Sequence, residues 1–286
     1  MPPTFRAVCA VLLVAGLASA SRPAGAESFH TCTGFIDVVP TTIATQGVWC
    51  MRKDLATAIT SGAAITIATN NVTIDCNDFK LGGLAAGDAT EAVGIEADNR
   101  INATVRHCNV RGFMYGTQLT GSGHAVVDSR FDSNTYSGIM ASGDGLQIQG
   151  NRVSDTGGST ISPTINAAGI TLATPTYSAT VRDNTIDTVF SLGGTATGIA
   201  AGIMNGTVER NTISVLRPGG AGLARGIRVF YANSRLMIRD NVIATQPAES
   251  GIGVDCNGAF ARDNMVSGLT SGYYEDCTDG GGNLAN

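Results

Sequence analysis

The sequence of 286 residues has few charges, few prolines and no long apolar run beyond its first segment. Charged residues make up 14% of the chain, well below the share in typical soluble domains, so the chain is not a disordered polyelectrolyte. Acidic residues outnumber basic ones by 23 to 18, and the net charge of -5 argues against a basic surface for nucleic acid. Only 8 prolines accompany 37 glycines, a composition that suits many short strands joined by tight turns.

Several short motifs are also absent. The chain has no C-x-x-C pair, so a zinc or redox site of that type has little support. It has no G-x-x-x-x-G-K-[ST] sequence, which excludes a P-loop for nucleotide phosphates. After residue 26 no stretch is long and apolar enough to predict a transmembrane helix.

Residues 1–26 have the features of a secretory signal peptide. Arg6 gives a positive start, and residues 7–18 form an apolar run that is too short to span a bilayer. An A-x-A cleavage pattern ends at Ala26, with a second candidate ending at Ala20. The alternative is a buried helix of the mature fold. We expect the protein to be exported, and thus to be secreted or periplasmic.

Beyond this segment the chain has six cysteines. An even number in an oxidising compartment indicates disulfide bonds, although the count leaves their pairing open. The candidates are Cys32, Cys50, Cys76, Cys108, Cys256 and Cys277.

A six-residue pattern, V-x-x-N-x-I, recurs eight times with replacements at some positions. The intervals between its Asn positions run from 21 residues (Cys108 to Ser129, which replace Asn) to 33 residues (Asn151 to Asn184). This scatter indicates a unit of about 22 residues with loop insertions. The copies occupy residues 74–79, 105–110, 126–131, 148–153, 181–186, 208–213, 238–243 and 261–266.

A glycine, usually followed by isoleucine, precedes most copies by about ten residues. We interpret these glycines as turn residues. Each unit then has a Gly-led strand, a turn, and a second strand bent at the Asn, a residue that tolerates the left-handed conformation. The pairs are Gly94-Ile95, Gly116-Thr117, Gly138-Ile139, Gly169-Ile170, Gly198-Ile199, Gly226-Ile227 and Gly251-Ile252.

Such short units must stack, because each has too little apolar area to fold alone. Stacking at about 4.8 Å pairs each strand with the units above and below it. The Val and Ile positions then form a continuous core, worth about 1.5–3 kcal/mol for each buried side chain. The Asn side chains are predicted to hydrogen-bond along the stack as a ladder rather than to bind a ligand. The pattern predicts an all-β parallel solenoid of about eight coils.

The combination of Gly-Ile and V-x-x-N-x-I resembles the right-handed parallel β-helix family, which includes pectate-lyase-like enzymes and NosD-like repeat proteins. Residues 49–55, 64–68 and 71–75 resemble the entry segment of such helices, and the resemblance covers about residues 45–270. It implies a single-stranded right-handed parallel β-helix over residues 61–270. Residues 27–60 are expected to form an N-terminal cap and residues 271–286 a C-terminal cap or tail, because an open end is an aggregation-prone edge.

Within this fold a specific disulfide pairing is expected. Two of the cysteines are 21 residues apart, close to one coil, and two others lie in neighbouring copies near the Asn bend. The expected pairs are Cys256–Cys277, Cys76–Cys108 and, by placement in the cap, Cys32–Cys50.

The resemblance implies a substrate groove on the outward side chains of the Gly-led strands. Alternation places Glu96 and Asp98 outward on one strand, roughly 6–7 Å apart. Paired carboxylates at this separation could act as acid and base in inverting glycoside hydrolysis. The alternative is a solvated acidic edge. Gln118 is an expected substrate contact on the following strand.

Arg228 and Asp255, on neighbouring coils, are the second pair of catalytic candidates. Arg225, Phe230 and Tyr231 flank them and are candidate substrate contacts. An arginine can bind a uronate carboxylate through two hydrogen bonds, and an aromatic ring can stack on a sugar. The alternative is an ordinary salt bridge between coils.

No metal site or cofactor is evident in the sequence. A β-elimination often needs Ca²⁺ to acidify the proton beside the carboxylate, so Ca²⁺ is expected only if the protein is a lyase. The D-P-H-D sequence of β-helix alginate epimerases, the Asp-rich motifs of polygalacturonases and a Met- and His-rich copper site are all absent.

Three functions are therefore considered. The first is a lyase or hydrolase of an acidic polysaccharide, and the second is a non-catalytic glycan-binding or cell-surface protein. The third, an accessory protein of periplasmic metal or assembly pathways, has the least support.

The remaining polar residues are expected to be structural. His107 should be a surface rung, and His124, which lies in a glycine-containing turn, should be exposed. Three Arg-Asp pairs recur in one column and predict exposed ion pairs worth about 0–1 kcal/mol each. They are Arg182-Asp183, Arg239-Asp240 and Arg262-Asp263.

Overall fold

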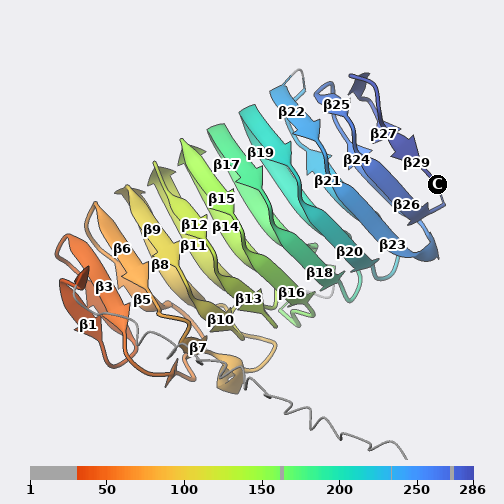
Figure 1. Cartoon of the computed structure of the whole chain (residues 1–286). Coiled ribbons are helices and arrows are strands. Elements are labelled where there is room, and N and C mark those ends of the chain that lie inside the picture. The colour runs from red at the N-terminus through yellow and green to blue at the C-terminus, as the bar shows by residue number, and fades with distance from the viewer. Residues whose placement is uncertain (1–30, 162–163, 233, 271–273) are drawn as a thin grey trace, which may run out of the picture. The chain divides into compact units, whose positions relative to one another are not determined.

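The computed structural model describes residues 31–161, 164–232, 234–270 and 274–286. The expected signal peptide, residues 1–26, lies outside the described residues. The strands of the described residues form a 19-stranded and a 10-stranded sheet, and neighbouring strands pair in parallel. The coils are stacked one beside the next (Figure 1). Each coil contributes two strands, or two parts of one long strand, to the 19-stranded sheet, which forms two faces, and one strand to the 10-stranded sheet, which forms the third.

Face 1 carries the Gly-led strands. It consists of β2 (Thr41–Ile43), β5 (Ala63–Ile67), β8 (Val93–Ile101), β11 (Tyr115–Ser122), β14 (Ser137–Asp144), the first part of β17 (Ala167–Arg182), the first part of β19 (Ala196–Glu209), β21 (Ala224–Val229), β24 (Gly251–Asp255) and β27 (Tyr274–Glu275).

Face 2 carries the strands that lead to the Asn positions. It consists of β1 (Gly34–Ile36), β3 (Gly47–Met51), β6 (Val72–Asp75), β9 (Ala103–Arg106), β12 (Ala125–Val127), β15 (Leu146–Gln149), the second parts of β17 and β19, β22 (Arg235–Arg239), β25 (Phe260–Arg262) and β28 (Thr278–Asp279).

Face 3 is the separate sheet. It consists of β4 (Leu55–Ala56), β7 (Lys80–Gly82), β10 (Asn109–Arg111), β13 (Arg130–Asp132), β16 (Arg152–Gly157), β18 (Thr185–Phe190), β20 (Thr212–Arg217), β23 (Val242–Glu249), β26 (Met265–Leu269) and β29 (Leu284–Ala285).

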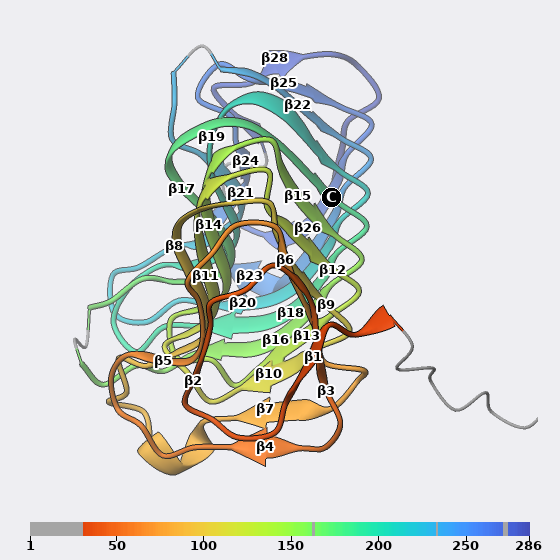
Figure 2. The ribbon, with the colours of Figure 1, turned by 90° about the vertical axis from the view of Figure 1, so that its left-hand side faces the viewer.

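Each coil passes from face 1 to face 2 and then to face 3, and Figure 2 shows the three faces surrounding the interior. The eight copies of the sequence pattern lead into the eight strands from β7 to β26, and β4 and β29 add one strand at each end. The strands within residues 34–56 and 274–285 pair in the same parallel sheets. A short 3₁₀ helix covers Leu84–Ala86. The described part of the chain contains no helix of the length and apolar character that crossing a bilayer demands.

Columns of branched apolar side chains fill the interior, as predicted. On face 1, Ile139, Ile170, Ile199 and Ile227 lie in register and are fully buried. On face 2 the corresponding column runs through Val126, Ile148, Val181, Val208 and Ile238. Because each coil buries the side chains of its neighbours, the core is continuous along the stack.

The glycines of the Gly-led strands are not turn residues, which corrects the interpretation of the sequence. They lie within the strands of face 1, and none of them has a positive φ. A Cβ atom at Gly94 or Gly226 would lie 2.4 Å from the carbonyl oxygen of the next glycine in the column. Glycine is therefore required by the close approach of the neighbouring coil.

The last Gly-Ile pair of the sequence pattern, Gly251-Ile252, does not take the expected place in the column. Ile227 pairs with Val254, so Gly253-Val254 takes the place expected for Gly251-Ile252. This shift of two residues brings Arg228 directly opposite Asp255.

The Asn ladder is confirmed. The side-chain oxygen of Asn211 accepts hydrogen bonds from the backbone N–H and the amide group of Asn184, at 3.1 and 2.9 Å. The same pair of bonds links Asn151 to Asn184, Asn211 to Asn241 and Asn241 to Asn264. It also extends to Asn283, which the sequence pattern missed.

The bend at each ladder position is made by the preceding residue, not by the Asn as expected. Asp183, Arg210, Asp240 and Asp263 have φ values between 51° and 57°. The Asn side chain instead accepts from the backbone N–H of the equivalent residue in the coil before it, and the ladder asparagines are buried and have no positive φ.

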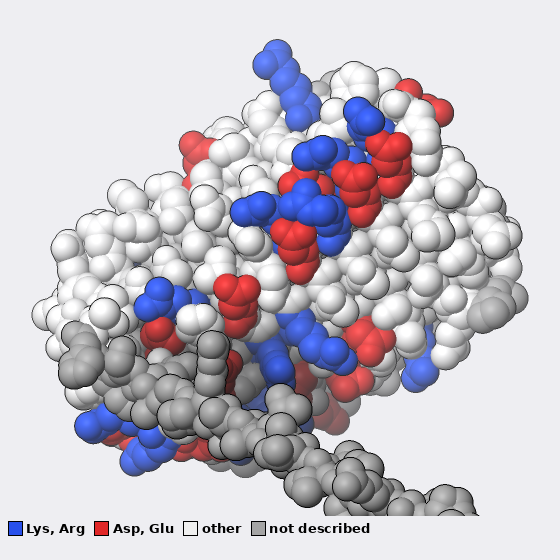
Figure 3. Space-filling view, viewed as in Figure 1, with Lys and Arg blue, Asp and Glu red and all other residues white. Residues whose placement is uncertain are grey.

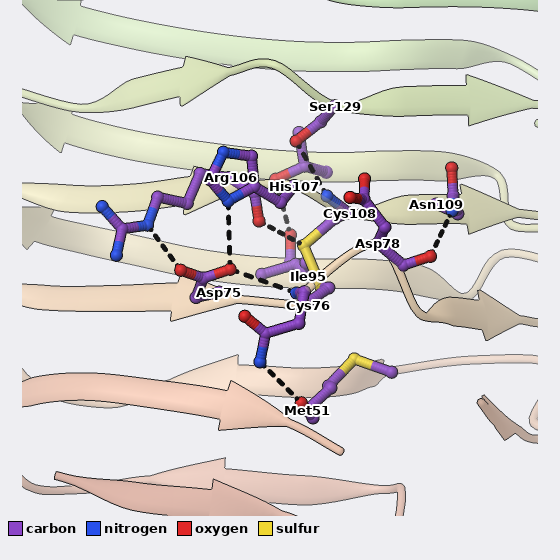
Figure 4. The surroundings of a disulfide bond; sticks show 12 residues. Met51, Asp75, Cys76, Asp78, Ile95, Arg106, His107, Cys108, Asn109 and Ser129 are labelled. Carbon is purple, nitrogen blue, oxygen red and sulfur yellow. Dashed lines mark hydrogen bonds and ion pairs between the residues drawn. A yellow bond between two sulfur atoms is a disulfide. The ribbon is translucent and has the colours of Figure 1, made fainter. Parts of the chain in front are cut away.

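All three expected disulfides are present, pairing Cys32 with Cys50, Cys76 with Cys108, and Cys256 with Cys277. Figure 4 shows the Cys76–Cys108 bond, which stands at the ladder position next to Ser129. The backbone N–H of Cys108 donates to the Ser129 hydroxyl at 3.1 Å, so the rungs continue through serine to the disulfide. Cys76 is fully buried, whereas Asn77, which holds the Asn place of the pattern, is only partly buried and donates to the carbonyl oxygen of Met51 at 2.9 Å.

His124 is fully buried, and the expectation that it is exposed is wrong. Its Nδ1 accepts a hydrogen bond from the backbone N–H of Ala103 at 3.1 Å, and its Nε2 lies 3.1 Å from the carbonyl oxygen of Thr120. Burial lowers the pKa of His124, because the cation would lose its hydration. His107, by contrast, lies at the surface with its Nδ1 3.3 Å from Asp75.

Candidate functional site

The outward side chains of face 1 form a groove between β14 and β21, here called the face 1 groove. Its volume is about 140 Å³. The strands alternate between inward apolar side chains and outward polar or small ones, so the groove floor consists of alanines and threonines. The lining residues are Tyr136, Asn166, Ala167, Ala168, Thr171, Thr195, Thr197, Ala200, Arg228 and Phe230.

Arg228 and Phe230 form one wall of this groove, as the sequence placed them. The guanidinium carbon of Arg228 lies 4.9 Å from the centre of the Phe230 ring, a cation–π arrangement. Burial, aided by the positive charge of Arg225, lowers the pKa of Arg228. The Nε atom of Arg228 is 3.7 Å from a carboxylate oxygen of Asp255, which is too long for a hydrogen bond. Arg228 thus forms only a long ion pair with Asp255, without a hydrogen bond.

Asp255 is held chiefly by Arg225. A terminal nitrogen of Arg225 donates to the same Asp255 oxygen that faces Arg228. Both side chains are mostly buried, and the buried Nε of Arg225 has no hydrogen-bond partner among the described residues. Arg225 therefore neutralises Asp255 behind the groove rather than lining it.

The opposite end of the groove is aromatic. Tyr136 packs edge-to-face against Tyr115, with ring centroids 5.2 Å apart. Burial, with a smaller effect of Tyr136, raises the pKa of Tyr115. Sequence reasoning missed Tyr136 because it lies in the turn before β14, outside the strand pattern.

Glu96 and Asp98 lie elsewhere on face 1. Both are on β8, which is separated from β21 by β11, β14, β17 and β19. Asp98 accepts a hydrogen bond from the Thr120 hydroxyl at 2.8 Å, and Gln118 stands in register opposite Glu96. The structure therefore does not bring Glu96 and Asp98 together with Arg228 and Asp255.

Tyr231 lines a different hollow, of about 300 Å³, at the turn between faces 1 and 2. Met204, Asn205, Ala232, Ser234 and Arg235 complete that hollow. Among the substrate contacts predicted beside Arg228, only Phe230 lines the face 1 groove.

The residues around Asp255 do not fit Ca²⁺. Calcium takes six to eight oxygen ligands, whereas Asp255 already accepts a hydrogen bond from Arg225 and has Arg228 beside the same oxygen. Two guanidinium groups at that oxygen repel a cation. In the described part of the chain, no three His, Cys, Asp or Glu side chains cluster as metal ligands would.

A second groove, the face 2 groove, was not predicted and is larger, about 340 Å³. It crosses β15, β17, β19 and β22, and its lining residues are Gln147, Gln149, Thr180, Arg182, Thr207, Glu209 and Arg239. The alternation of inward and outward residues on the second strand of each unit would have predicted that these side chains point outward.

A band of alternating acidic and basic side chains runs along one edge of the face 2 groove (Figure 3). The expected pairs are present, with Arg262 at 2.8 Å from Asp263 and the other two pairs near 4 Å. Other contacts join neighbouring coils. Arg210 donates to Asp183 of the preceding coil, which lowers the pKa of Asp183. The nearly buried Glu209 binds its sequence neighbour Arg210 and also Arg239 of the following coil.

Comparison with solved structures shows similarity of fold. The crystal structure of the Dettilon tailspike protein (gp208) is 15% identical, with a TM-score of 0.57, and the match covers 84% of this chain and 47% of that chain. This chain thus spans about half the length of the tailspike chain.

Two further structures match with lower TM-scores. The A-module of mannuronan C-5 epimerase AlgE6 from Azotobacter vinelandii is 14% identical, with a TM-score of 0.44 and coverage of 86% of this chain and 82% of that one. The DFA-IIIase from Arthrobacter chlorophenolicus A6 without its lid is 13% identical, with a TM-score of 0.41 and coverage of 82% and 70%.

No curated protein sequence matches the chain. A family model described as a right handed beta helix region does match, over residues 89–272, which is more than half of the chain. This match agrees with the parallel coils, the buried aliphatic columns and the Asn ladder. The chain belongs to the right-handed β-helix family.

Proposed function

We propose that this chain is an exported glycan-binding protein that holds an acidic polysaccharide in the face 1 groove without cleaving it. The observation that carries the proposal is the position of Arg228, which lines the groove over the Phe230 ring and is only loosely paired with Asp255. A sugar carboxylate could accept two hydrogen bonds from this guanidinium, and its negative charge would stabilise the charged form of Arg228, which burial disfavours.

The aromatic residues supply the second part of the recognition. Phe230 and Tyr136 lie at the two ends of the groove, with threonine hydroxyls between them. Binding sites of this kind combine apolar contact area with a few polar groups that fix orientation. Sugar rings have apolar faces and polar edges, so they suit this lining.

Binding is favoured over cleavage because the acids do not converge. None of the described residues that line the face 1 groove is Asp, Glu or His. Asp255 is neutralised by Arg225, and Glu96 and Asp98 lie several coils away. Acid–base catalysis needs a proton-transferring group within hydrogen-bond reach of the substrate.

Export is proposed on the basis of the three disulfides, since such bonds persist in oxidising compartments. The sequence features of residues 1–26 support the same location.

The test is calorimetric titration with oligogalacturonate and with alginate oligosaccharides. Binding should weaken as salt is raised, and Arg228→Ala should weaken it by about tenfold or more. Arg217→Ala, which removes an exposed arginine of face 3, is the matched control and should bind as the unmodified chain does. Equal binding by the Arg228→Ala and unmodified chains would refute the proposed site.

Cleavage is tested in the same samples by assaying new reducing ends and unsaturated products. We expect neither. Product formation that is lost in Asp255→Ala would show that the protein is an enzyme and would overturn the binding-only proposal.

A further inference from the structure

The face 2 groove differs from the face 1 groove in its chemistry. Its polar groups form two rows along the stack, two residues apart on each strand. In the first row Gln147, Thr180 and Thr207 lie in register. In the second row Gln149, Arg182, Glu209 and Arg239 lie in register. With about 4.8 Å between strands, the first row extends for about 10 Å and the second for about 14 Å.

The first row is free to bind a ligand. Among the described residues, neither the amide of Gln147 nor the hydroxyls of Thr180 and Thr207 make a hydrogen bond within the protein. The side-chain oxygen of Gln149 accepts from Arg182 at 2.7 Å, which leaves its amide N–H groups facing the groove. Both hydrogen-bond donors and acceptors are thus available along the rows.

Beyond the groove, the first row continues with two apolar residues on the next two strands. Thr207 pairs with Met237, and Met237 pairs with Phe260. The Phe260 side chain is 48% exposed. An aromatic ring at the end of a row of amides and hydroxyls offers a surface against which the apolar face of a sugar can pack.

The charges beside the groove balance. The band at its edge contains four arginines and four acidic residues that pair with one another: Arg182, Arg210, Arg239 and Arg262 with Asp183, Glu209, Asp240 and Asp263. Glu209, the one acid among the described residues that line the groove, is bound by two arginines. Because these charges pair with one another, the band as a whole carries no net charge that would select an anion.

From these observations we propose that the face 2 groove is a second carbohydrate site, which binds an uncharged, hydroxyl-rich oligosaccharide laid along the stack. Each sugar presents hydroxyl groups on both edges of the chain, which matches two rows of donors and acceptors. The site is independent of the face 1 groove, because it lies on another face and shares no lining residue with it.

The test is titration of the full chain with three uncharged probes, cellohexaose, mannohexaose and xylohexaose. At least one should bind with a dissociation constant below about 1 mM, and its affinity should change less than about twofold between low and high salt. The double variant Thr180→Val/Thr207→Val should weaken this binding by about tenfold or more. Phe260→Ala, an exposed substitution, should weaken it by about threefold or more.

The matched control is Thr185→Val/Thr212→Val, which changes two exposed threonines that pair on face 3. It should bind the probe as the unmodified chain does, and so should Arg228→Ala. The proposal is overturned if none of the three probes binds, if binding falls with salt, or if Thr180→Val/Thr207→Val and its control behave alike. Loss of acidic-glycan binding in Arg228→Ala has no bearing on this site, so the two proposals fail separately.

Discussion

Arg228 and Asp255 face each other on β21 and β24, yet the carboxylate of Asp255 is committed to Arg225. This arrangement separates two roles that the sequence could not separate. The carboxylate of Asp255 balances the charge of the mostly buried Arg225, while Arg228 presents its charge to the face 1 groove.

A first prediction follows for Asp255→Asn. The substitution removes the negative charge beside Arg228, so affinity for oligogalacturonate should rise by about two- to fivefold. Stability should fall, because the mostly buried Arg225 loses its ionic partner. Calorimetric titration and urea unfolding measure the two effects. Asp132→Asn, on face 3, is the control for affinity, and a decrease in affinity for Asp255→Asn would contradict the role given to Asp255.

The ladder gives a second prediction, for Asn211→Ala. The side-chain oxygen of Asn211 accepts from two buried donors of Asn184, and its amide donates to the carbonyl of Val181 at 3.0 Å. Removing it leaves buried donors unpaired, so the free energy of unfolding should fall by about 2–5 kcal/mol. Asn205→Ala, at an exposed position, should cost less than about 1 kcal/mol. Similar unfolding midpoints in urea for the two variants would show that the ladder contributes little.

A third prediction concerns the glycine column of face 1. A Cβ at Gly198 would lie 2.6 Å from a methyl group of Ile213 and 2.7 Å from the carbonyl oxygen of Gly226. Gly198→Ala should therefore destabilise the protein by about 1–3 kcal/mol through overpacking. At Gly82 the nearest atom would be 3.7 Å away, and φ is not positive, so Gly82→Ala should be neutral or slightly stabilising. Thermal unfolding of both variants checks the difference, and equal melting temperatures would argue against it.

The buried His124 gives a fourth prediction, on pH. Its pKa is lowered in the folded chain, because burial disfavours the cation. Below about pH 6.5 the unfolded chain therefore binds a proton that the folded chain does not, and stability falls as the pH falls. The slope from this one group is at most about 1.4 kcal/mol per pH unit.

The measurement is urea unfolding between pH 7.5 and about pH 5. His124→Asn keeps an acceptor for Ala103 but cannot titrate, so its stability should depend less steeply on pH. An unchanged slope in His124→Asn would show that another group causes the acid sensitivity.

Much of the fold was predictable because each coil repeats one local rule. Val181, Val208 and Ile238 recur at the same place in the pattern, and a buried column requires the same kind of side chain in each coil. The Asn ladder and the disulfides followed for the same reason, since residues at equivalent positions become neighbours.

The details that failed depend on contacts between coils, which a repeat pattern does not specify. Ile227 pairs with Val254 rather than with Ile252, and the Gly-Ile pattern alone does not specify this register. His124 was expected to be exposed because glycine precedes it, yet its neighbours in register, Ala103 and Leu146, face inward. Comparing it with these two positions would have indicated burial.

The candidate site could be predicted only in part, because the sequence pattern does not specify contacts between coils. Alternation places Arg228 and Phe230 on the outer face, but it cannot show that Arg225 reaches Asp255 or that Tyr136 closes the groove. Both depend on side chains that cross from one coil to another.

Hydrogen exchange measured by mass spectrometry, with and without oligogalacturonate, tests the central claim most directly. Bound glycan should slow exchange in peptides covering residues 166–171, 195–200 and 224–230, which line the face 1 groove. Peptides of face 3, such as residues 212–217, should be unaffected. Protection confined to other faces, or no protection at saturating ligand, would contradict the account.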